Sequence, residues 1–423
     1  MMASEILQPF LGALQASLTV LLDVFYGVVA AQFGLLDDNS ANAISHAAIK
    51  MFLPALMFTR IGSQVHLESA TRYIPIIIWG ILYHVAAIGG TLAISRMFKL
   101  PAWTTPAISF NNAISMPLLL IQSLEVTGVL EPLTGPGDKS PSEAVKRAES
   151  YFLVFAMVAN GIVFAIGGNL LSKKKDPEDR ENGSADGNEE DDEPAEHTSL
   201  LPDSAVRHHL TIQAKAQKKL DEYNNKLPPW AQKICHYLYM FCNGPLFGAV
   251  MGFVVGIIPA LHKAFFNETQ EGGYFNAWLT SSLKNIGDLF VVLQVVIVGV
   301  QLATSLRKLK EGEESGPVPW VPMVFVLAAR YLIWPAIGIA IIYGFAAKTN
   351  IFGDDKMLWF TMMVMPSGPP AMKLLALADT SGIEHKEVMS ISKLLTIAHV
   401  AAPLSSLAVV GALKAVEKIG GSS

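Results

Sequence analysis

Polar and helix-breaking residues are concentrated in two short stretches of an otherwise apolar chain, and these residues are equipped to bind a solute. The first stretch, SFNNAISMPLLLI, contains Asn111, Asn112, Ser115 and Pro117. The second stretch, MVMPSGPPAMKLLAL, contains Pro366, Ser367, Gly368, Pro369, Pro370 and Lys373. Proline removes a backbone donor and clashes with the preceding turn. Each stretch is therefore predicted to interrupt a helix and to free backbone groups for binding.

The chemistry of both stretches favours an anion. The N-terminus of a half-helix carries a positive dipole end and unpaired N–H groups, which attract negative charge. Asn112, Ser115 and Ser367 supply hydrogen-bonding side chains, and Lys373 places a positive charge at the start of the second half-helix. The alternative interpretation is a pair of proline kinks without a ligand, with Lys373 extending to the membrane interface.

The rest of the chain has the composition of a membrane protein. It has 423 residues, of which 51% are hydrophobic and 16% are charged, with a mean hydropathy of +0.39. Residues 172–229 hold 23 of the charges, so the remainder has roughly half the charge density of a soluble domain. This composition excludes a water-soluble globular enzyme as the main body. Because no zinc-protease, serine-hydrolase or nucleotide-binding motif is present either, we predict no enzymatic activity, cofactor or metal.

Ten apolar runs approach the length that spans a bilayer, about 20 residues. They cover residues 8–32, 42–60, 73–97, 103–127, 149–171, 238–262, 279–305, 319–346, 356–378 and 387–414. Five runs precede the polar segment and five follow it, and each interrupted run is the fourth of its half. Interruptions at matching positions are typical of inverted-repeat transporters with a site near the membrane midplane. The predicted fold is an all-α membrane protein of ten transmembrane helices, arranged as two inverted five-helix repeats.

The predicted organisation is a first repeat at 1–171, a disordered acidic loop at 172–229 and a second repeat at 230–423. The loop is rich in Glu, Asp, Gly and Ser and has little to bury. Five helices on each side place both termini opposite the loop, and the Lys/Arg distribution favours a cytoplasmic loop. Cys235 and Cys242 give no disulfide or zinc pattern, and the acidic balance argues against nucleic-acid binding.

Ionisable residues at membrane depth are costly, which makes them candidates for function. His46 and Lys50 lie four residues apart and share a helical face, and Asp23 could neutralise Lys50. These three residues are predicted to couple ions or protons, with a structural ion pair as the alternative. Arg330 is interpreted as close to the end of its segment and is expected at the interface with water.

The second interrupted stretch resembles a known family. MPSGPPAMKLLALAD is similar to the proline-rich stretch of the auxin efflux carrier family, most of all to its PIN-LIKES branch with fungal relatives. NGPLFGAVMGFVVGIIP, RYLIWPAIGI and SKLLTIAHVAAPLSSLAVVGALK resemble the sixth, eighth and tenth helices of that family. The resemblance covers essentially the whole chain outside residues 172–229.

The resemblance implies a fold distantly like that of bile acid/sodium symporters, with a scaffold part, a transport part, and fourth and ninth helices that cross where both unwind. It implies the endoplasmic reticulum membrane, with the plasma membrane as the alternative, and a link to auxin. Asn112 matches a family amide five residues before the crossover proline, Pro117. Ser115 and Lys373 stand where that branch usually has Asn, and Asn111 where it usually has Gly. These differences bear on the substrate.

The predicted function is secondary transport of a small organic anion, such as an auxin-like aromatic carboxylate, by alternating access at the crossover. Two alternatives stay open. One is a sodium-coupled organic-anion symporter, and the other is a non-transporting sensor or scaffold that acts through the acidic loop. The expected partners are the lipid bilayer, the anion and, as a further option, a second copy of the chain in a homodimer.

Overall fold

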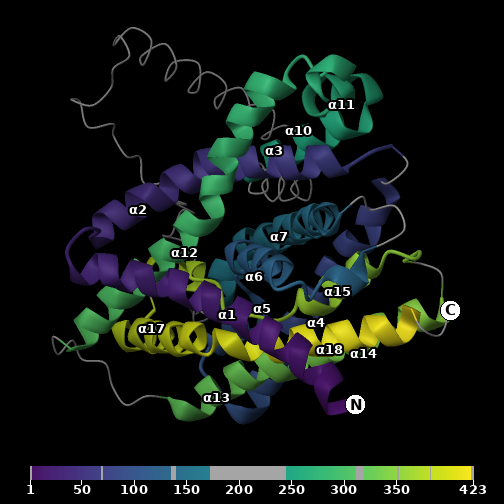
Figure 1. Cartoon of the computed structure of the whole chain (residues 1–423). Helices are drawn as coiled ribbons and strands as arrows, with labels where there is room; N and C mark the ends of the chain where they lie inside the picture. Colours follow the sequence, from purple (N-terminus) through teal and green to yellow (C-terminus); the bar gives the residue numbers. More distant parts are fainter. Residues whose placement is uncertain are drawn as a thin grey trace, which may run out of the picture. The chain divides into compact units, whose positions relative to one another are not determined.

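The computed structural model describes residues 2–67, 70–134, 140–171, 244–310, 319–349, 352–381 and 383–420 (Figure 1). The predicted acidic loop and both cysteines lie outside these ranges. The first part forms α1 (Met2–Gln32), α2 (Asp38–Ala47), α3 (Leu53–Gln64), α4 (Ile74–Phe98), α5 (Thr104–Ser109), α6 (Ser115–Val126) and α7 (Pro141–Leu171). The second forms α10 (Gly244–Ile257), α11 (Pro259–Phe266), α12 (Ser281–Lys310), α13 (Trp320–Ala328), α14 (Trp334–Lys348), α15 (Lys356–Val364), α16 (Lys373–Thr380), α17 (His385–Val400) and α18 (Ser405–Gly420).

Every regular element among the described residues is a helix, and extended pairing is limited to one isolated antiparallel bridge. Five segments of the described chain are long and apolar enough to cross a bilayer: Leu7–Gln32, Asp38–Gln64, Ala70–Phe98, Asn276–Arg307 and Trp320–Lys348. Two bent pairs, α10 with α11 at 108° and α17 with α18 at 53°, raise the number to seven if each pair is one span. An all-α, multi-pass membrane protein is therefore confirmed.

The predicted fourth and ninth runs do not reach spanning length as single helices. Their breaks leave half-helices of 6, 12, 9 and 8 residues, which are α5, α6, α15 and α16. A continuous helix needs about 20 residues to cross the hydrocarbon core. The arrangement as ten spans in two inverted repeats therefore stays a prediction.

Two of the long helices continue past an internal proline because a wider, π-helical turn precedes it. The turn Ala48–Phe52 joins α2 to α3 ahead of Pro54, and the turn Ala329–Ile333 joins α13 to α14 ahead of Pro335. Proline cannot make the ordinary backbone bond to the fourth residue before it, and π-turns and proline are common causes of local distortion in a helix. The second turn carries Arg330 into the interior of the protein.

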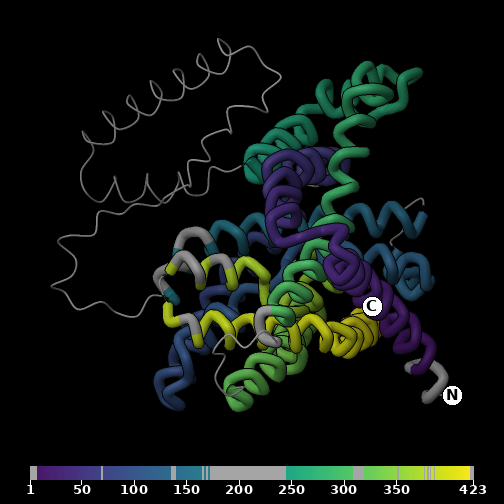
Figure 2. The backbone as a smooth tube through the Cα atoms, turned by 90° about the vertical axis from the view of Figure 1, so that its left-hand side faces the viewer, coloured from purple at the N-terminus to yellow at the C-terminus, as the bar shows by residue number. Residues whose placement is uncertain are grey.

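Helices α1, α3, α10 and α12 pack backbone against backbone at glycines, and we call them the glycine-packed group. A Cβ atom at Gly27 of α1 would collide with the carbonyl oxygen of Val296 in α12. A Cβ atom at Gly248 of α10 would likewise collide with the carbonyl oxygen of Pro54 in α3. Helix α3 runs beside α10 in both views (Figures 1 and 2). Small residues allow this close approach, which drives helix association in lipid.

Helices α4 to α7 and α13 to α18 surround the two interrupted stretches, and we call them the crossover group. Large side chains make their contacts. Tyr83 of α4 is 1% exposed and meets Trp334 of α14 edge to face, with ring centroids 5.3 Å apart. Where a glycine lies between these helices, as Gly80 does, a Cβ atom would meet a side chain, that of Phe155, at 3.3 Å. Interlocking aromatic side chains therefore form the core of this group.

Candidate functional site

Both interrupted stretches are extended between two half-helices, as the prolines and the glycine predict. α5 stops at Ser109 and α6 starts at Ser115, while α15 stops at Val364 and α16 starts at Lys373. The two extended segments cross in an antiparallel sense, and we call this place the crossover. Because α6 and α16 both begin here, the positive ends of two helix dipoles face it.

The crossover satisfies part of the backbone that the two breaks release. The N–H of Asn112 donates to the carbonyl oxygen of Pro369 at 3.1 Å, and the N–H of Ala371 donates to that of Phe110 at 2.9 Å. The segments thus bind each other as neighbouring strands do. Non-helical backbone at membrane depth requires such internal partners, so the crossover belongs inside the protein.

Arg330 donates hydrogen bonds to backbone groups at both breaks from the interior of the protein. Its Nε donates to the carbonyl of Gly368 at 2.8 Å, and its Nη1 donates to the carbonyl of Ile108 at 3.0 Å and to the hydroxyl of Tyr83 at 2.9 Å. The expectation that Arg330 lies at the interface is wrong, because the residue is 0% exposed. Where a half-helix ends, its last carbonyl groups lack a backbone donor and form the negative end of the helix dipole. A cationic donor therefore stabilises them. Gly368 has a φ of +109°, a conformation that glycine adopts without strain.

A cavity of about 320 Å³ lies at the crossover, between α7 and α16 on one wall and α2 and α12 on the other. The predicted residues Asn111, Asn112, Ser115 and Lys373 line it, as does His46. Lys373 and His46 are its ionisable side chains, and no carboxylate lies among the described residues that form its walls. The charge of these walls therefore favours an anion.

Lys373 is placed in this cavity and not at the membrane interface. Its Nζ donates to Oδ1 of Asn160 on α7 at 2.9 Å. Ser115 donates from its hydroxyl to Oδ1 of Asn112 at 3.1 Å, and Asn111 donates from Nδ2 to the carbonyl of Met365. The predicted polar residues are thus fixed in place by hydrogen bonds before any solute arrives.

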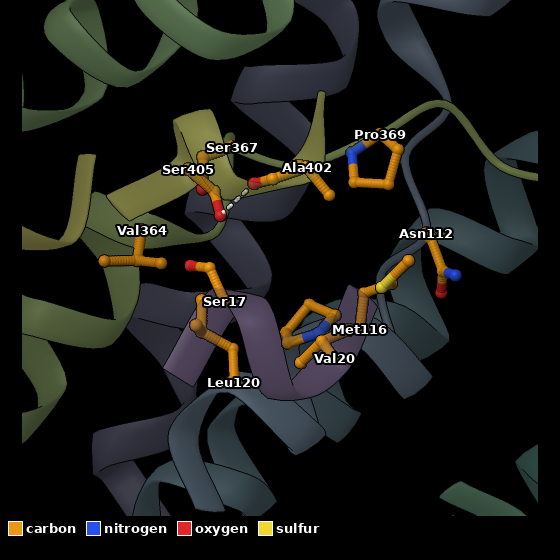
Figure 3. A pocket seen from close by; sticks show the side chains of 12 residues that line it. Ser17, Val20, Asn112, Met116, Leu120, Val364, Ser367, Pro369, Ala402 and Ser405 are labelled. Atoms are coloured by element: carbon orange, nitrogen blue, oxygen red, sulfur yellow. Dashed lines mark hydrogen bonds between the residues drawn. The ribbon is translucent and has the colours of Figure 1, made fainter. Parts of the chain in front are cut away.

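A second cavity, of about 30 Å³, lies at the crossover against α1, α6 and α18 (Figure 3). It has room for no more than a few waters. The predicted residues Pro117, Ser367, Gly368 and Pro369 line it. Asn112 lines both cavities, which places the backbone of the crossover between them.

Two predicted prolines have structural positions outside both cavities. Pro370 forms the antiparallel bridge with Asn111. Pro366 lies against Gly338 of α14, where a Cβ atom would meet the proline ring at 3.1 Å. These two residues shape the crossover and do not line the space beside it.

The three residues predicted to couple ions or protons do not come together as one cluster. His46 lines the large cavity, whereas Lys50 is exposed on its π-helical turn and Asp23 is half-buried on α1. Within the described chain, no hydrogen bond or ion pair joins Asp23 to Lys50, so the predicted pair is not formed. The helical periodicity that places a side chain on one face of its own helix does not tell which neighbour that face meets.

Helices α12 and α7 contribute a polar wall to the large cavity, and this wall is not among the predicted site residues. Gln294 of α12 donates to the hydroxyl of Ser45 at 3.5 Å, and Asn160 accepts from Lys373. Gln294 and Gln301 are seven residues apart in an otherwise apolar run, and both line the cavity. This spacing puts two amides on one helical face, and that pattern could have been recognised.

The chain matches a protein-family model described as a membrane transport protein over residues 13–409. It is 22% identical over 412 residues to an uncharacterized transporter of Schizosaccharomyces pombe, covering 88% of this chain and 89% of the relative. It is 22% identical over 391 residues to the Arabidopsis thaliana Protein PIN-LIKES 5, covering 88% and 91%. An uncharacterized transporter of Saccharomyces cerevisiae is 23% identical over 414 residues, covering 89% and 90%.

The match to the family model extends over the crossover and both cavities, and the relatives agree with the resemblance found in the sequence. The family model alone spans nearly every described helix. The chain therefore belongs to the membrane transport protein family, which is the family of the auxin efflux carriers and includes the PIN-LIKES proteins.

Proposed function

We propose that the chain is a secondary carrier that moves a small organic anion, such as an auxin-like aromatic carboxylate, by alternating access at the crossover. The observation that carries this proposal is the pair of unequal cavities, of about 320 Å³ and about 30 Å³, that share Asn112. A carrier exposes one site to the two sides of a membrane in turn. A large cavity and a much smaller one that meet at the same residue are the geometry expected if one of two access routes is widened at a time.

The electrostatics of the crossover support an anion. Two half-helices, α6 and α16, begin there and present positive dipole ends. The carbonyl groups of Ile108 and Gly368, which would repel an anion, are occupied by the guanidinium of Arg330. Lys373 places its amino group in the large cavity, where its protonated form attracts an anion.

In this proposal the carboxylate of the substrate lies between Lys373 and the start of α6. Asn112 and Ser115 hydrogen-bond it, and Asn160 orients the lysine ammonium. The apolar part of the substrate lies against the aliphatic and aromatic lining, which includes Phe290 and Val298. Small-molecule sites commonly combine such walls with a few fixed polar groups.

Three finer points belong to the same proposal. The ten predicted runs form two inverted five-helix repeats, the protein resides in the endoplasmic reticulum membrane, and residues 172–229 face the cytoplasm. The compartment follows from the resemblance to the PIN-LIKES branch, members of which are among the relatives.

The test is uptake of labelled carboxylates, with indole-3-acetate as the first probe, by the purified chain in proteoliposomes. We expect Asn112→Ala and Lys373→Ala each to lower uptake at least tenfold, about 1.4 kcal/mol of lost binding or coupling. Ser63→Ala serves as a matched control, because Ser63 lies on α3 and lines neither cavity. Absent uptake of every carboxylate tried, or unchanged uptake in both variants, would count against the proposal.

The same vesicles separate the two alternatives. Replacing sodium with choline abolishes uptake only if the carrier is a sodium symporter. If the chain is a carrier, deleting residues 172–229 leaves uptake intact. If the chain is a sensor or scaffold, the same deletion abolishes its effect in cells without changing uptake.

A further inference from the structure

A charged cluster lies at the boundary between the glycine-packed group and the crossover group. Arg60 of α3 places Nη1 3.0 Å from Oε2 of Glu149 on α7, and Nη2 2.8 Å from Oδ1 of Asp288 on α12. Gln122 of α6 donates from Nε2 to Oε1 of Glu149 at 2.7 Å. None of these four side chains lines either cavity at the crossover, so the cluster is separate from the proposed anion site.

The central pair of this cluster is largely removed from water. The side chain of Glu149 is 3% exposed and that of Arg60 is 14% exposed. Buried charges are costly unless they are paired, and breaking such a pair leaves an uncompensated charge behind. The Arg60–Glu149 contact therefore favours the arrangement of the two groups seen here over one in which they are apart.

Arg60 keeps a second partner within its own group. Asp288 follows Gly287, and a Cβ atom at Gly287 would come within 2.7 Å of the backbone nitrogen of Leu56. Leu56 lies one helical turn before Arg60, so close backbone packing fixes the distance between α3 and α12 beside the Arg60–Asp288 pair. This pair can persist when α7 moves.

Glu149 likewise keeps a partner within the crossover group. Gln122 is on α6, and α7 itself is joined to α15 through Asp355, which accepts from Tyr151 at 2.7 Å and pairs with Arg147 at 3.2 Å. Helices α6 and α7 are also in contact with each other, and if they move together Glu149 retains the hydrogen bond from Gln122. Each ion of the boundary pair thus has a partner on its own side, which lowers the cost of separating the pair.

We propose that the Arg60–Glu149 ion pair is a reversible latch between the two groups, closed in the state described here and opened during each transport cycle. This proposal rests on the alternating access proposed above. A purely structural ion pair needs no further partners, because it does not break during function. Here Arg60 and Glu149 each have a second partner on their own side, which stabilises them when the pair is apart.

The latch is tested by thiol labelling, which needs no substrate. Both native cysteines, Cys235 and Cys242, are replaced by Ser in the full chain, and a single reporter, Ser405→Cys, is placed in the small cavity. We expect Glu149→Gln to raise the maleimide labelling rate of this reporter about three- to tenfold. The reason is that the state with an open small cavity becomes more populated. This effect is smaller than the full cost of breaking a buried ion pair, because Arg60 keeps its contact with Asp288.

Matched controls distinguish a latch from general loosening. Asp288→Asn removes the partner of Arg60 inside the glycine-packed group, and it should leave the labelling rate unchanged or lower it. A reporter at Ser45, in the large cavity, should label at an unchanged rate in Glu149→Gln because the described state still dominates. Glu149→Asp, which keeps the charge but shortens the side chain, should give an intermediate rate and replaces Glu149→Gln if that variant does not fold.

Three results would overturn the latch: an unchanged rate at Ser405→Cys in Glu149→Gln, an equal rise in Asp288→Asn, or a parallel rise at both reporters. These results are independent of the anion site. If Asn112→Ala and Lys373→Ala abolish uptake while labelling does not respond to Glu149→Gln, the latch fails and the proposed function stands. If uptake is never found while labelling shifts as expected, the anion substrate proposed for the crossover fails, whereas the change between two arrangements of the groups stands.

Discussion

The glycine-packed group and the crossover group are held together by different kinds of contact. In the first, a Cβ atom added at Gly27 or Gly287 would meet backbone atoms of the neighbouring helix. In the second, a Cβ atom added at Gly80 or Gly411 would meet side chains, at 3.3 Å and 3.0 Å. Backbone contacts leave no freedom to adjust, whereas side chains can change rotamer.

This difference suggests which part of the molecule stays rigid and which part carries the site. Backbone-to-backbone packing fixes the helices of the glycine-packed group against one another. The crossover group holds the broken helices, whose backbone depends on hydrogen bonds from Arg330 and from the opposite stretch. Substitutions at these contacts test the difference, because they either break one kind of contact or measure its contribution to the site.

The largest effect is expected where backbone meets backbone. Gly27→Leu adds four carbon atoms at a place where even a Cβ atom collides with the carbonyl of Val296. Overpacking typically costs about 1–3 kcal/mol and occasionally more, and here the obstructing atom cannot move aside. We expect little or no monodisperse protein in size-exclusion chromatography after membrane extraction.

The matched control for this change is Gly89→Leu. Gly89 is on α4, is exposed, and has no atom within 4 Å of an added Cβ. We expect this variant to elute as the parent does, because its new side chain can face lipid. Normal elution of Gly27→Leu would show that the glycine-packed group is not rigid.

The next effect tests the hydrogen bonds of the crossover group. Arg330→Met removes the donor to Gly368, Ile108 and Tyr83 and leaves buried carbonyl groups unpaired. Each unsatisfied group costs about 1–3 kcal/mol, so we expect a loss of roughly 3 kcal/mol, seen as a lower melting temperature together with loss of transport. Arg330→Lys keeps the charge but not the fork of donors, and it should restore only part of the stability. A melting temperature equal to that of the parent in Arg330→Met would contradict the role assigned to this residue.

Arg330 also marks the limit of what the sequence predicts. The sequence predicts both breaks, and the structure confirms them, because Pro117 and the Pro-Ser-Gly-Pro-Pro run act on their own helix. The placement of Lys373 beside an anion-favouring cavity follows from the same local rule. The burial of Arg330 depends instead on α4 and α5, which supply Tyr83 and Ile108. No pattern within the helix of Arg330 contains that information, so tertiary contacts decide it.

The same limit explains the coupling residues and the cavity wall. The charges of Asp23 and Lys50 predict a pair, yet no ion pair forms between them in the described chain, where Asp23 is half-buried and Lys50 is exposed. Gln294 and Asn160 lie in apolar runs whose composition predicts only a membrane span. Their role in the cavity depends on how α12 and α7 meet the crossover, which a single sequence does not reveal.

A smaller effect is expected at the turn of the second break. Gly368 has a φ of +109° and no atom within 4 Å of an added Cβ, so the backbone conformation alone opposes a side chain. We expect Gly368→Ala to lower the unfolding free energy by about 1–2 kcal/mol and to reduce uptake, since the carbonyl of this residue is held by Arg330. Gly89→Ala is the control. If thermal unfolding of Gly368→Ala matches that of Gly89→Ala, the turn is not strained and the crossover is more adaptable than its hydrogen bonds indicate.

The smallest effect tests whether the rigid group contributes to the site at all. Gln294 is on α12 of the glycine-packed group, lines the large cavity, and makes only a long hydrogen bond of 3.5 Å to Ser45. Gln294→Leu preserves size and removes hydrogen-bonding capacity, so we expect an unchanged melting temperature. If the substrate bridges the two groups, its apparent KM in proteoliposomes should rise about three- to tenfold, the equivalent of one hydrogen bond of roughly 1 kcal/mol. Gln301→Leu, seven residues further along the same face, should have a weaker effect because Gln301 lies closer to the C-terminal end of α12 than Gln294 does. An unchanged KM in both variants would mean that the crossover group alone recognises the substrate, and the glycine-packed group would then serve only as a wall against which that group moves.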